Sequence, residues 1–294
     1  MKTDAQGKTD IGLRRESNQD YFVIDNERGI FIVCDGIGGH HGGEVASQKA
    51  IEYTLEYLVE HWSQVEEARN HPIGTFKLNQ LVERAIHQAC RNIHFLGRTD
   101  PALQGMGTTL TLLMIVDGQA FVGHVGDSRL YIKRNNEVFL LTTDHTLYNE
   151  MVTEFESVDE VDIRKFRHCL TRSVGNTDTV AVETLSFEAR ENDVLLLCTD
   201  GLSNYFEDET DIAKMLEGGH VNEIANSLVS FANEQGGSDN ITALVIRLID
   251  VDDFLVNPHR IRLTQCDNSD VTIEEERNAE QDSRLQDTGP FNRE

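Results

Sequence analysis

The chain has 294 residues, with 26 Lys and Arg against 51 Asp and Glu, which gives a formal net charge of −25. This charge argues against a nucleic-acid partner, whose phosphates are bound through Lys and Arg, and against docking on an anionic membrane surface. Hydrophobic residues make up 39% of the chain, so most of it can fold around a large core.

The targeting and cysteine patterns favour a cytoplasmic protein. No apolar run reaches the roughly 18 residues that a membrane-spanning helix needs, and the first ten residues lack the apolar segment of a secretory signal. The chain has five cysteines and no CxxC pair, as expected in a reducing compartment where disulfides are rare. The acidic surface and the absence of a zipper pattern favour a monomer.

Several apolar runs are predicted to be strands. Asp117-Gly118 and Asn135-Asn136 each separate two such runs, and both pairs are typical of tight hairpin turns. Sheets joined by hairpins are mainly antiparallel. The predicted strands cover residues 21–24, 29–34, 108–116, 119–125, 129–133, 137–142, 193–199 and 241–249.

Helical periodicity appears in residues 44–62, 77–96 and 221–234. Each segment carries one apolar stripe, so each is expected to cover one face of a sheet. The fold class is therefore α+β, with antiparallel sheet inside and helices outside. Residues 146–168 are charged and weakly helical, and they are predicted to form an inserted surface subdomain. Residues 251–294 carry eleven acids and few large apolar side chains, so we expect them to be disordered.

Aspartates recur at the ends of the predicted strands. Asp35 and Asp200 each follow an apolar run and precede a glycine. Asp127 follows a third run, and Asp20 and Asp239 precede two others. A strand end aims a carboxylate rigidly, and clustered carboxylates repel one another unless a cation lies between them. Oxygen ligands alone suit Mg²⁺ or Mn²⁺, although aspartate is also an ordinary turn residue at such positions.

Eight short motifs occur in a fixed order along about residues 10–248. They are RRESNQD (14–20), VCDGIGGHHGGE (33–44), GMGTTL (105–110), GHVGDSRLY (123–131), TTDHT (142–146), LTRSVG (170–175), LLLCTDGL (195–202) and GGSDNITALVI (236–246). In type and order they closely resemble the motifs of the metal-dependent serine/threonine protein phosphatases, the PPM or type 2C family, in its bacterial branch.

The resemblance implies a four-layer α-β-β-α sandwich, in which two antiparallel sheets are flanked by helices and a binuclear metal centre lies at one end. It implies a phosphatase domain over residues 1–250, an inserted flap at about 146–170, and a separate acidic tail at 251–294. It also implies metal-dependent hydrolysis of phosphoserine and phosphothreonine in proteins by a metal-activated water, in opposition to a bacterial Ser/Thr kinase.

The resemblance also assigns ligands for two Mn²⁺ or Mg²⁺ ions. Asp35 matches the residue that bridges the two ions, and Gly36 offers its backbone carbonyl to one of them. Asp200 and Asp239 match the ligands of the other ion, and Asp20 lies in the same shell.

Three further positions bear on catalysis. Arg15 matches the arginine that grips the substrate phosphate. Asp127 matches the acid that reaches a third, weaker ion, but Asn204 stands where many members have an aspartate, so the resemblance leaves the third site in doubt. Ile37 stands where animal members have a histidine proposed as general acid, so that acid is absent here or supplied by metal-bound water. His40 and His41 in the same glycine-rich loop either donate a proton to the leaving oxygen or are solvated loop histidines.

Two alternatives to this enzyme remain open. A catalytically weak pseudophosphatase would bind phosphoproteins without hydrolysing them, and Asn204 favours this interpretation. A regulatory phosphatase for a transcription-control protein would usually carry a sensor domain, for which 294 residues leave little room.

Some other charged residues are given structural or selective roles. Arg129, Lys133 and Arg134 are interpreted as hairpin surface, and Arg172 as an anchor of the insert. The acids between Glu150 and Asp162 predict a preference for phosphosites flanked by Lys or Arg.

Overall fold

The computed structural model describes residues 2–38, 41–69, 71–154, 163–206 and 208–250, and the backbone of 264–265. Most of the predicted acidic tail, the middle of the predicted flap and His40 lie outside these residues. No helix in the described ranges is both long enough and apolar enough to cross a membrane.

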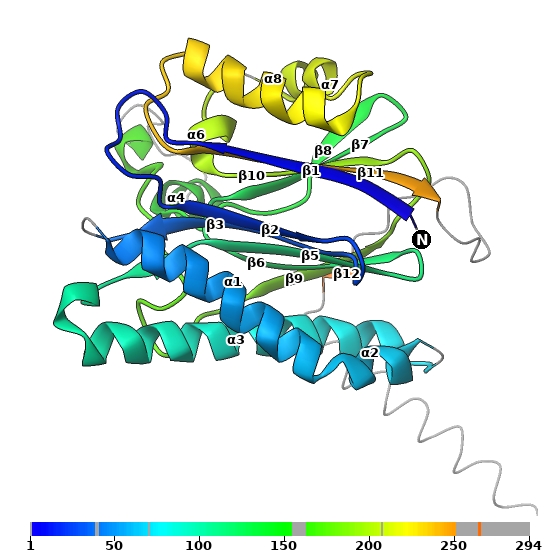
Figure 1. The fold of residues 1–294 in the computed structure, drawn as a ribbon, viewed down its shortest axis with the longest axis horizontal. Coiled ribbons are helices and arrows are strands. Elements are labelled where there is room, and N and C mark those ends of the chain that lie inside the picture. The colour runs from blue at the N-terminus through cyan, green and yellow to red at the C-terminus, as the bar shows by residue number, and fades with distance from the viewer. Residues whose placement is uncertain are drawn as a thin grey trace, which may run out of the picture.

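The strands form two antiparallel sheets that pack face to face (Figure 1). Their bounds are β1 Lys2–Asp10, β2 Asp20–Asp25, β3 Ile30–Ile37, β4 Gly107–Thr108, β5 Leu110–Val116, β6 Gln119–Val125, β7 Arg129–Arg134, β8 Glu137–Leu140, β9 Glu183–Glu188, β10 Val194–Cys198, β11 Ile241–Asp250 and β12 Thr264–Gln265. The larger sheet has the order β12-β9-β6-β5-β3-β2, with β4 beside β3, and the smaller has the order β1-β11-β10-β7-β8.

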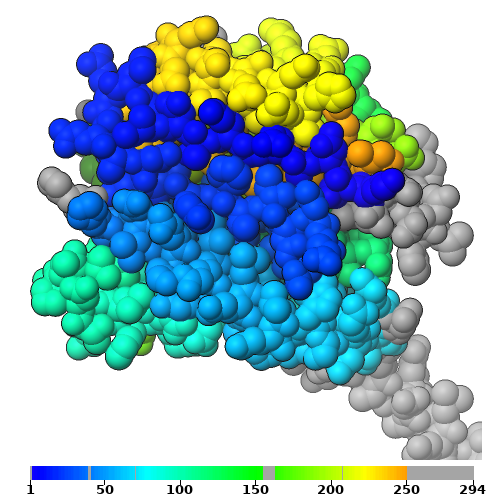
Figure 2. Space-filling view, in the orientation of Figure 1, coloured from blue at the N-terminus to red at the C-terminus, as the bar shows by residue number. Residues whose placement is uncertain are grey.

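Helices cover the outer face of each sheet. The helices of the described residues are α1 Gly42–Glu60, α2 Trp62–Ala68, α3 Gly74–Thr99, α4 Leu147–Glu154, α6 Asp200–Ser203, α7 Glu209–Met215 and α8 Val221–Glu234, with short 3₁₀ turns at Pro101–Leu103 and Arg164–Phe166. Of these, α4 and α6 lie at one end of the sandwich (Figure 1). In Figure 1, α1, α2 and α3 lie against the larger sheet, and α7 and α8 against the smaller. Figure 2 shows the deep-blue N-terminal segment as a continuous band between α8 and α1.

Three hydrophobic cores lie between these four layers. Side chains alternate along a strand, so β3 contributes Ile32 to the core under α1 and α3 and Phe31 to the core between the sheets. The third core joins the smaller sheet to α8, as in the packing of Leu196 near Leu228. The predicted four-layer α-β-β-α sandwich is therefore confirmed, since each interface is closed by apolar side chains.

The two predicted hairpin turns are present. Asp117 and Gly118 have φ values of 47° and 77°, and Asn135 and Asn136 have values of 52° and 67°. These left-handed conformations are the ones that two-residue hairpins require. The sequence interpretation missed β1 and β9. Among the described strands β1 lies at the edge of its sheet, beside β11, and an edge strand tolerates polar residues, so apolar alternation is weak there.

The interpretation of Arg129 and Arg134 as hairpin surface is wrong. Arg134 is 7% exposed, and its Nε and Nη2 donate to the two carboxylate oxygens of Asp193 at 2.8 and 2.5 Å. Arg129 grips Asp144 in the same bidentate way, at 2.9 and 2.6 Å. Both arginines are paired because their strand, β7, lies inside the sheet between β10 and β8.

Candidate metal centre

One end of the sandwich collects the predicted site residues. It is the end where the β1–β2 loop, the start of α1 and α6 come together, on the left in Figure 1. An open cleft of about 450 Å³ there is lined by six of the seven predicted residues, Arg15, Asp35, Gly36, Asp127, Asp200 and Asp239. The seventh, Asp20, is the register partner of Asp35 on the neighbouring strand and is 5% exposed.

Asp20 is held from one side only. Its Oδ2 accepts hydrogen bonds from Thr199 Oγ1 at 2.7 Å and Thr242 Oγ1 at 2.6 Å. Its Oδ1 is buried and has no hydrogen-bond partner among the described residues. Burial raises the pKa of Asp20 to about 7. The two threonine hydrogen bonds lower this pKa, and the nearby negative charges of Asp200 and Asp239 raise it further.

The neighbouring acids are crowded in the same way. Burial, followed by the charges of Asp20 and Asp200, raises the pKa of Asp35 well above its ordinary value. Burial and the charge of Asp200 raise the pKa of Asp127 to about 7. Asp200 Oδ1 is a second buried oxygen without a partner among the described residues. A bound cation would coordinate the unpartnered oxygens and offset the repulsion between the carboxylates. The residues therefore fit a hard divalent ion such as Mn²⁺ or Mg²⁺.

The backbone around Asp35 is fixed by close contacts. Asp35 N–H donates to Thr109 Oγ1, and Asp35 O accepts from Thr109 N–H, both at 2.8 Å. A Cβ on Gly36 would lie 2.1 Å from Gly43 O, and one on Gly201 would lie 1.9 Å from Asn240 O. Both positions therefore require glycine, because the chain packs directly against the ends of the strands that carry Asp35 and Asp200.

Arg15 reaches the cleft from the β1–β2 loop. Its Nη2 donates to Asp239 Oδ2 at 2.5 Å, and half of its side chain is exposed. Asn240 holds this loop in place, since its Oδ1 accepts from Gln19 N–H and its Nδ2 donates to the carbonyls of Ile11 and Ser17. Asn240 was missed as a site residue, although the motif GGSDN contained it.

Two other side chains join the cleft. Asn204 Nδ2 donates to Asp200 Oδ2 at 3.2 Å, so the amide that replaces a family aspartate does lie at the site. His168, which the sequence interpretation missed, also lines the cleft, with Nδ1 3.4 Å from Asp200 Oδ2. No sequence signal marked it, because it lies in the charged insert. His41 precedes α1 and is not part of the described cleft lining.

The raised pKa values predict how the metal-free protein responds to pH. The pKa of Asp20 and of Asp127 is about 7 in the folded chain, against an ordinary value of 3.8. Between these values the folded chain binds more protons than the unfolded chain, so its stability falls as the pH rises. With EDTA present, we expect the melting temperature to be higher at pH 6 than at pH 8.

One variant and one addition check this prediction. Asp20→Asn should flatten the pH dependence, because it removes one of the carboxyl groups whose pKa is raised. Saturating Mn²⁺ should reverse the slope, because protons compete with the metal for the same oxygens. A metal-free protein that gains stability between pH 6 and pH 8 would contradict the crowding of these acids.

Comparison with known proteins gives consistent matches. A family model described as protein phosphatase 2C matches residues 13–238, which contain six of the seven predicted site residues and end directly before Asp239. The chain is similar to protein phosphatase PhpP of Streptococcus pneumoniae serotype 2, with 32% identity over 259 residues that cover 83% of this chain and 97% of that protein.

Two solved structures share the fold. The serine/threonine phosphatase PstP/Ppp of Mycobacterium tuberculosis superposes with a TM-score of 0.72 and 30% identity, covering 85% of this chain and 100% of that one. The catalytic domain of PstP in complex with two manganese ions superposes with a TM-score of 0.69 and 31% identity, covering 84% and 99%.

Proposed function

Because the chain belongs to the protein phosphatase 2C family, we propose that its acidic cleft hydrolyses phosphoserine and phosphothreonine in proteins with two bound divalent cations. One observation carries the proposal. The acids of four separate motifs line one cleft with Arg15, and Asp20 of a fifth segment lies beside them as the register partner of Asp35. One carboxylate oxygen of Asp20 and one of Asp200 are buried without a partner among the described residues.

We propose Asp35, Asp200, Asp239 and Asp20, with the carbonyl of Gly36, as the residues that hold two Mn²⁺ or Mg²⁺ ions. Ions bound there would supply Lewis acidity toward the phosphoryl oxygens and lower the pKa of water so that hydroxide forms near neutral pH. A third, weaker site would use Asp127 beside the amide of Asn204.

The protein's own groups would orient the substrate. The guanidinium of Arg15 has a planar fork that can donate to two phosphate oxygens at once. It is paired with Asp239 and is half exposed, so it can turn from that carboxylate toward a phosphate in the cleft. Asn240 fixes the position of the loop that carries Arg15, because its side chain donates to the backbone carbonyls of Ile11 and Ser17. The aspartates would bind the metal ions. Arg15 would neutralise the negative charge on the phosphoryl oxygens that the metal ions do not neutralise.

Phosphoproteins and a cognate Ser/Thr kinase are the partners that this activity implies. The pseudophosphatase alternative is not supported, since the family's acids are in place and the relatives are named phosphatases. Selection of basic flanking residues by the flap acids stays a prediction. Of those acids the structure describes Glu150 and Glu154, and both are exposed.

Hydrolysis of a phosphothreonine peptide, with Mn²⁺ titrated after EDTA treatment, tests the proposed function. The wild type should release phosphate only with metal. Arg15→Ala should raise KM for the peptide about ten-fold or more, because a bidentate charge-assisted contact is lost. Its Mn²⁺ affinity, measured by calorimetry, should be unchanged or higher, because a competing cation leaves Asp239.

Two outcomes would contradict these assignments. If the wild type binds the peptide and Mn²⁺ but never releases phosphate, the result would support the pseudophosphatase interpretation. An Arg15→Ala variant with unchanged KM would remove Arg15 from the phosphate site.

A further inference from the structure

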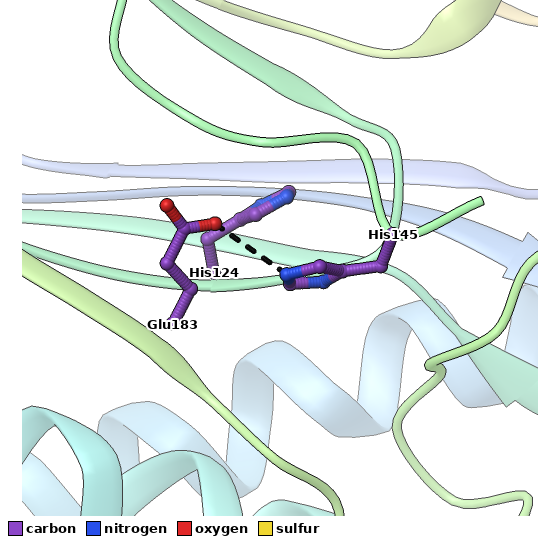
Figure 3. A group of neighbouring side chains, drawn as sticks. All are labelled: His124, His145 and Glu183. Atoms are coloured by element: carbon purple, nitrogen blue, oxygen red, sulfur yellow. Dashed lines mark ion pairs between the residues drawn. The ribbon is translucent and has the colours of Figure 1, made fainter. Parts of the chain in front are cut away.

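A cluster of buried titratable side chains lies beside the metal centre and outside the cleft. His124 is the penultimate residue of β6, His145 lies in the segment after β8, and Glu183 begins β9. Their nearest ligand atoms lie within 4.8 Å of one another. Figure 3 shows the carboxylate of Glu183 directed at the ring of His145, with the ring of His124 beside them. The two rings stack with their centroids 4.8 Å apart.

The hydrogen bonds of this cluster argue against a second metal site. His124 Nε2 lies 3.1 Å from the carbonyl of Thr143, so this nitrogen carries a proton. Glu183 accepts from the N–H and the hydroxyl of Thr143 at 3.2 and 3.3 Å. The guanidinium of Arg172 lies 3.2 Å from His145 Nε2, where it would repel a metal ion. The atoms that would bind a cation are therefore already used.

His145 instead holds Gly126, the residue before Asp127, from both sides. The backbone N–H of His145 donates to Gly126 O at 2.8 Å, and the side-chain Nδ1 accepts from Gly126 N–H at 3.0 Å. Because Nδ1 accepts, the proton of the neutral ring is on Nε2, which faces Glu183 Oε2 at 3.4 Å. The guanidinium that lies 3.2 Å from this nitrogen therefore does not donate a hydrogen bond to it. Gly126 has a φ of +112°, and a Cβ there would lie 2.6 Å from Thr109 Cγ2.

The residue after Asp127 is held just as firmly. Ser128 O accepts from Thr111 Oγ1 at 3.1 Å, and Ser128 Oγ is 2.7 Å from Thr109 Oγ1. The same threonine hydroxyl accepts from the backbone N–H of Asp35. Asp127 thus lies between two anchored neighbours, and one of these anchors also supports Asp35.

His145 also contacts the chain that returns from the insert. Its carbonyl accepts from Thr171 N–H at 2.9 Å, and Arg172 lies against its ring. The interpretation of Arg172 as an anchor of the insert agrees with this contact. One imidazole therefore contacts both the backbone beside Asp127 and the end of the insert.

We propose that His145 is a positioning residue of the metal centre, which aims Asp127 through Gly126 and connects it to the segment that returns from the insert. The inference rests on the proposed function, because it assigns a support to a proposed ligand of that site. The neighbours that orient metal ligands are not ligands themselves, but their loss commonly lowers metal affinity about 10- to 100-fold.

Two near-isosteric variants distinguish the hydrogen bond that Nδ1 accepts from Gly126 from the contacts of the rest of the His145 ring. In His145→Asn, the side-chain oxygen can replace Nδ1 as acceptor for Gly126 N–H. In His145→Gln, the amide can replace Nε2 toward Glu183, but the acceptor for Gly126 is lost. We expect His145→Gln to weaken the Asp127-dependent part of Mn²⁺ binding about ten-fold and His145→Asn to stay close to the wild type, as measured by calorimetry without substrate.

A double-mutant cycle tests whether His145 acts through Asp127. In an Asp127→Asn background, His145→Gln should have no further effect on Mn²⁺ affinity. His87→Asn serves as the matched control, because His87 bonds to one backbone carbonyl, that of Val180, outside the cleft lining. It should bind Mn²⁺ like the wild type.

The outcomes keep this inference separate from the proposed function. Equal Mn²⁺ affinities in the two His145 variants, unfolding of both, or additive effects in the cycle would overturn the role of His145, even if the wild type is an active phosphatase. A wild type without Mn²⁺-dependent hydrolysis would overturn the proposed function, whereas the Mn²⁺ calorimetry would still report on His145.

Discussion

Replacing Asp35 with asparagine is expected to reduce Mn²⁺-dependent hydrolysis of a phosphothreonine peptide by about a thousand-fold, the scale seen when one preorganised charge-stabilising group is lost. The same change is expected to stabilise the metal-free protein. The Asp35 carboxylate is buried beside Asp20 and Asp200, which is why its pKa is raised well above the ordinary value. Asparagine has nearly the same shape and carries no charge, so it removes the repulsion but is a poorer metal ligand.

Thermal unfolding in EDTA, followed by unfolding with Mn²⁺, measures both effects. The gain in melting temperature should be largest at pH 8 and smaller at lower pH, since a protonated Asp35 no longer repels its neighbours. The stabilisation by Mn²⁺ should shrink or vanish in the variant. Asp178→Asn, at an exposed loop position, is the matched control and should change neither quantity. A less stable metal-free variant, or one that keeps metal-dependent turnover, would disprove the assignment.

The largest expected loss of stability lies away from the cleft, at Arg134. Arg134→Met should lower the free energy of unfolding by about 3–5 kcal/mol, because removing one partner of a buried ion pair leaves the other charge uncompensated. The side chain of Asp193 is 2% exposed, and it also accepts the backbone N–H of Arg190. Mn²⁺ affinity should not change, because neither residue lines the cleft.

Denaturant unfolding of three variants checks this prediction. Lys133→Met is the matched control, since this neighbouring cation donates to the backbone carbonyl of Ala213 and its loss should cost about 1 kcal/mol or less. Adding Asp193→Asn to Arg134→Met should recover part of the loss, because it removes the uncompensated charge. Equal stability of the Arg134 and Lys133 variants would show that the ion pair contributes little.

The strands and turns that position the site were readable from local sequence. Apolar runs that end at Asp35 and Asp200 predicted buried strands, and the glycine after each aspartate marked a close backbone approach. The structure adds that Asp200 is also the first residue of α6. Strand β1 escaped prediction because an edge strand can be polar on both faces.

Family motifs located Arg15 and the six predicted metal-binding positions, and the fold brings these seven residues to one end of the sandwich. They did not indicate what supports those residues. Asn240 bonds to Ile11, 229 positions away, and no local pattern marks such a contact. His168 and His145 likewise gain their places only through contacts with residues distant in sequence, Asp200 and Gly126.

The sequence by itself thus determined most of the strand and turn pattern, the acids that are proposed as metal ligands and the family to which the chain belongs. These depend on residue type, short spacing and motif order, which are properties of a linear chain. The tertiary structure decided which carboxylates are crowded enough to shift their pKa, which arginine is buried in an ion pair, and which histidine holds the backbone beside Asp127. Burial, charge proximity and hydrogen-bond geometry arise only when segments distant in sequence pack together.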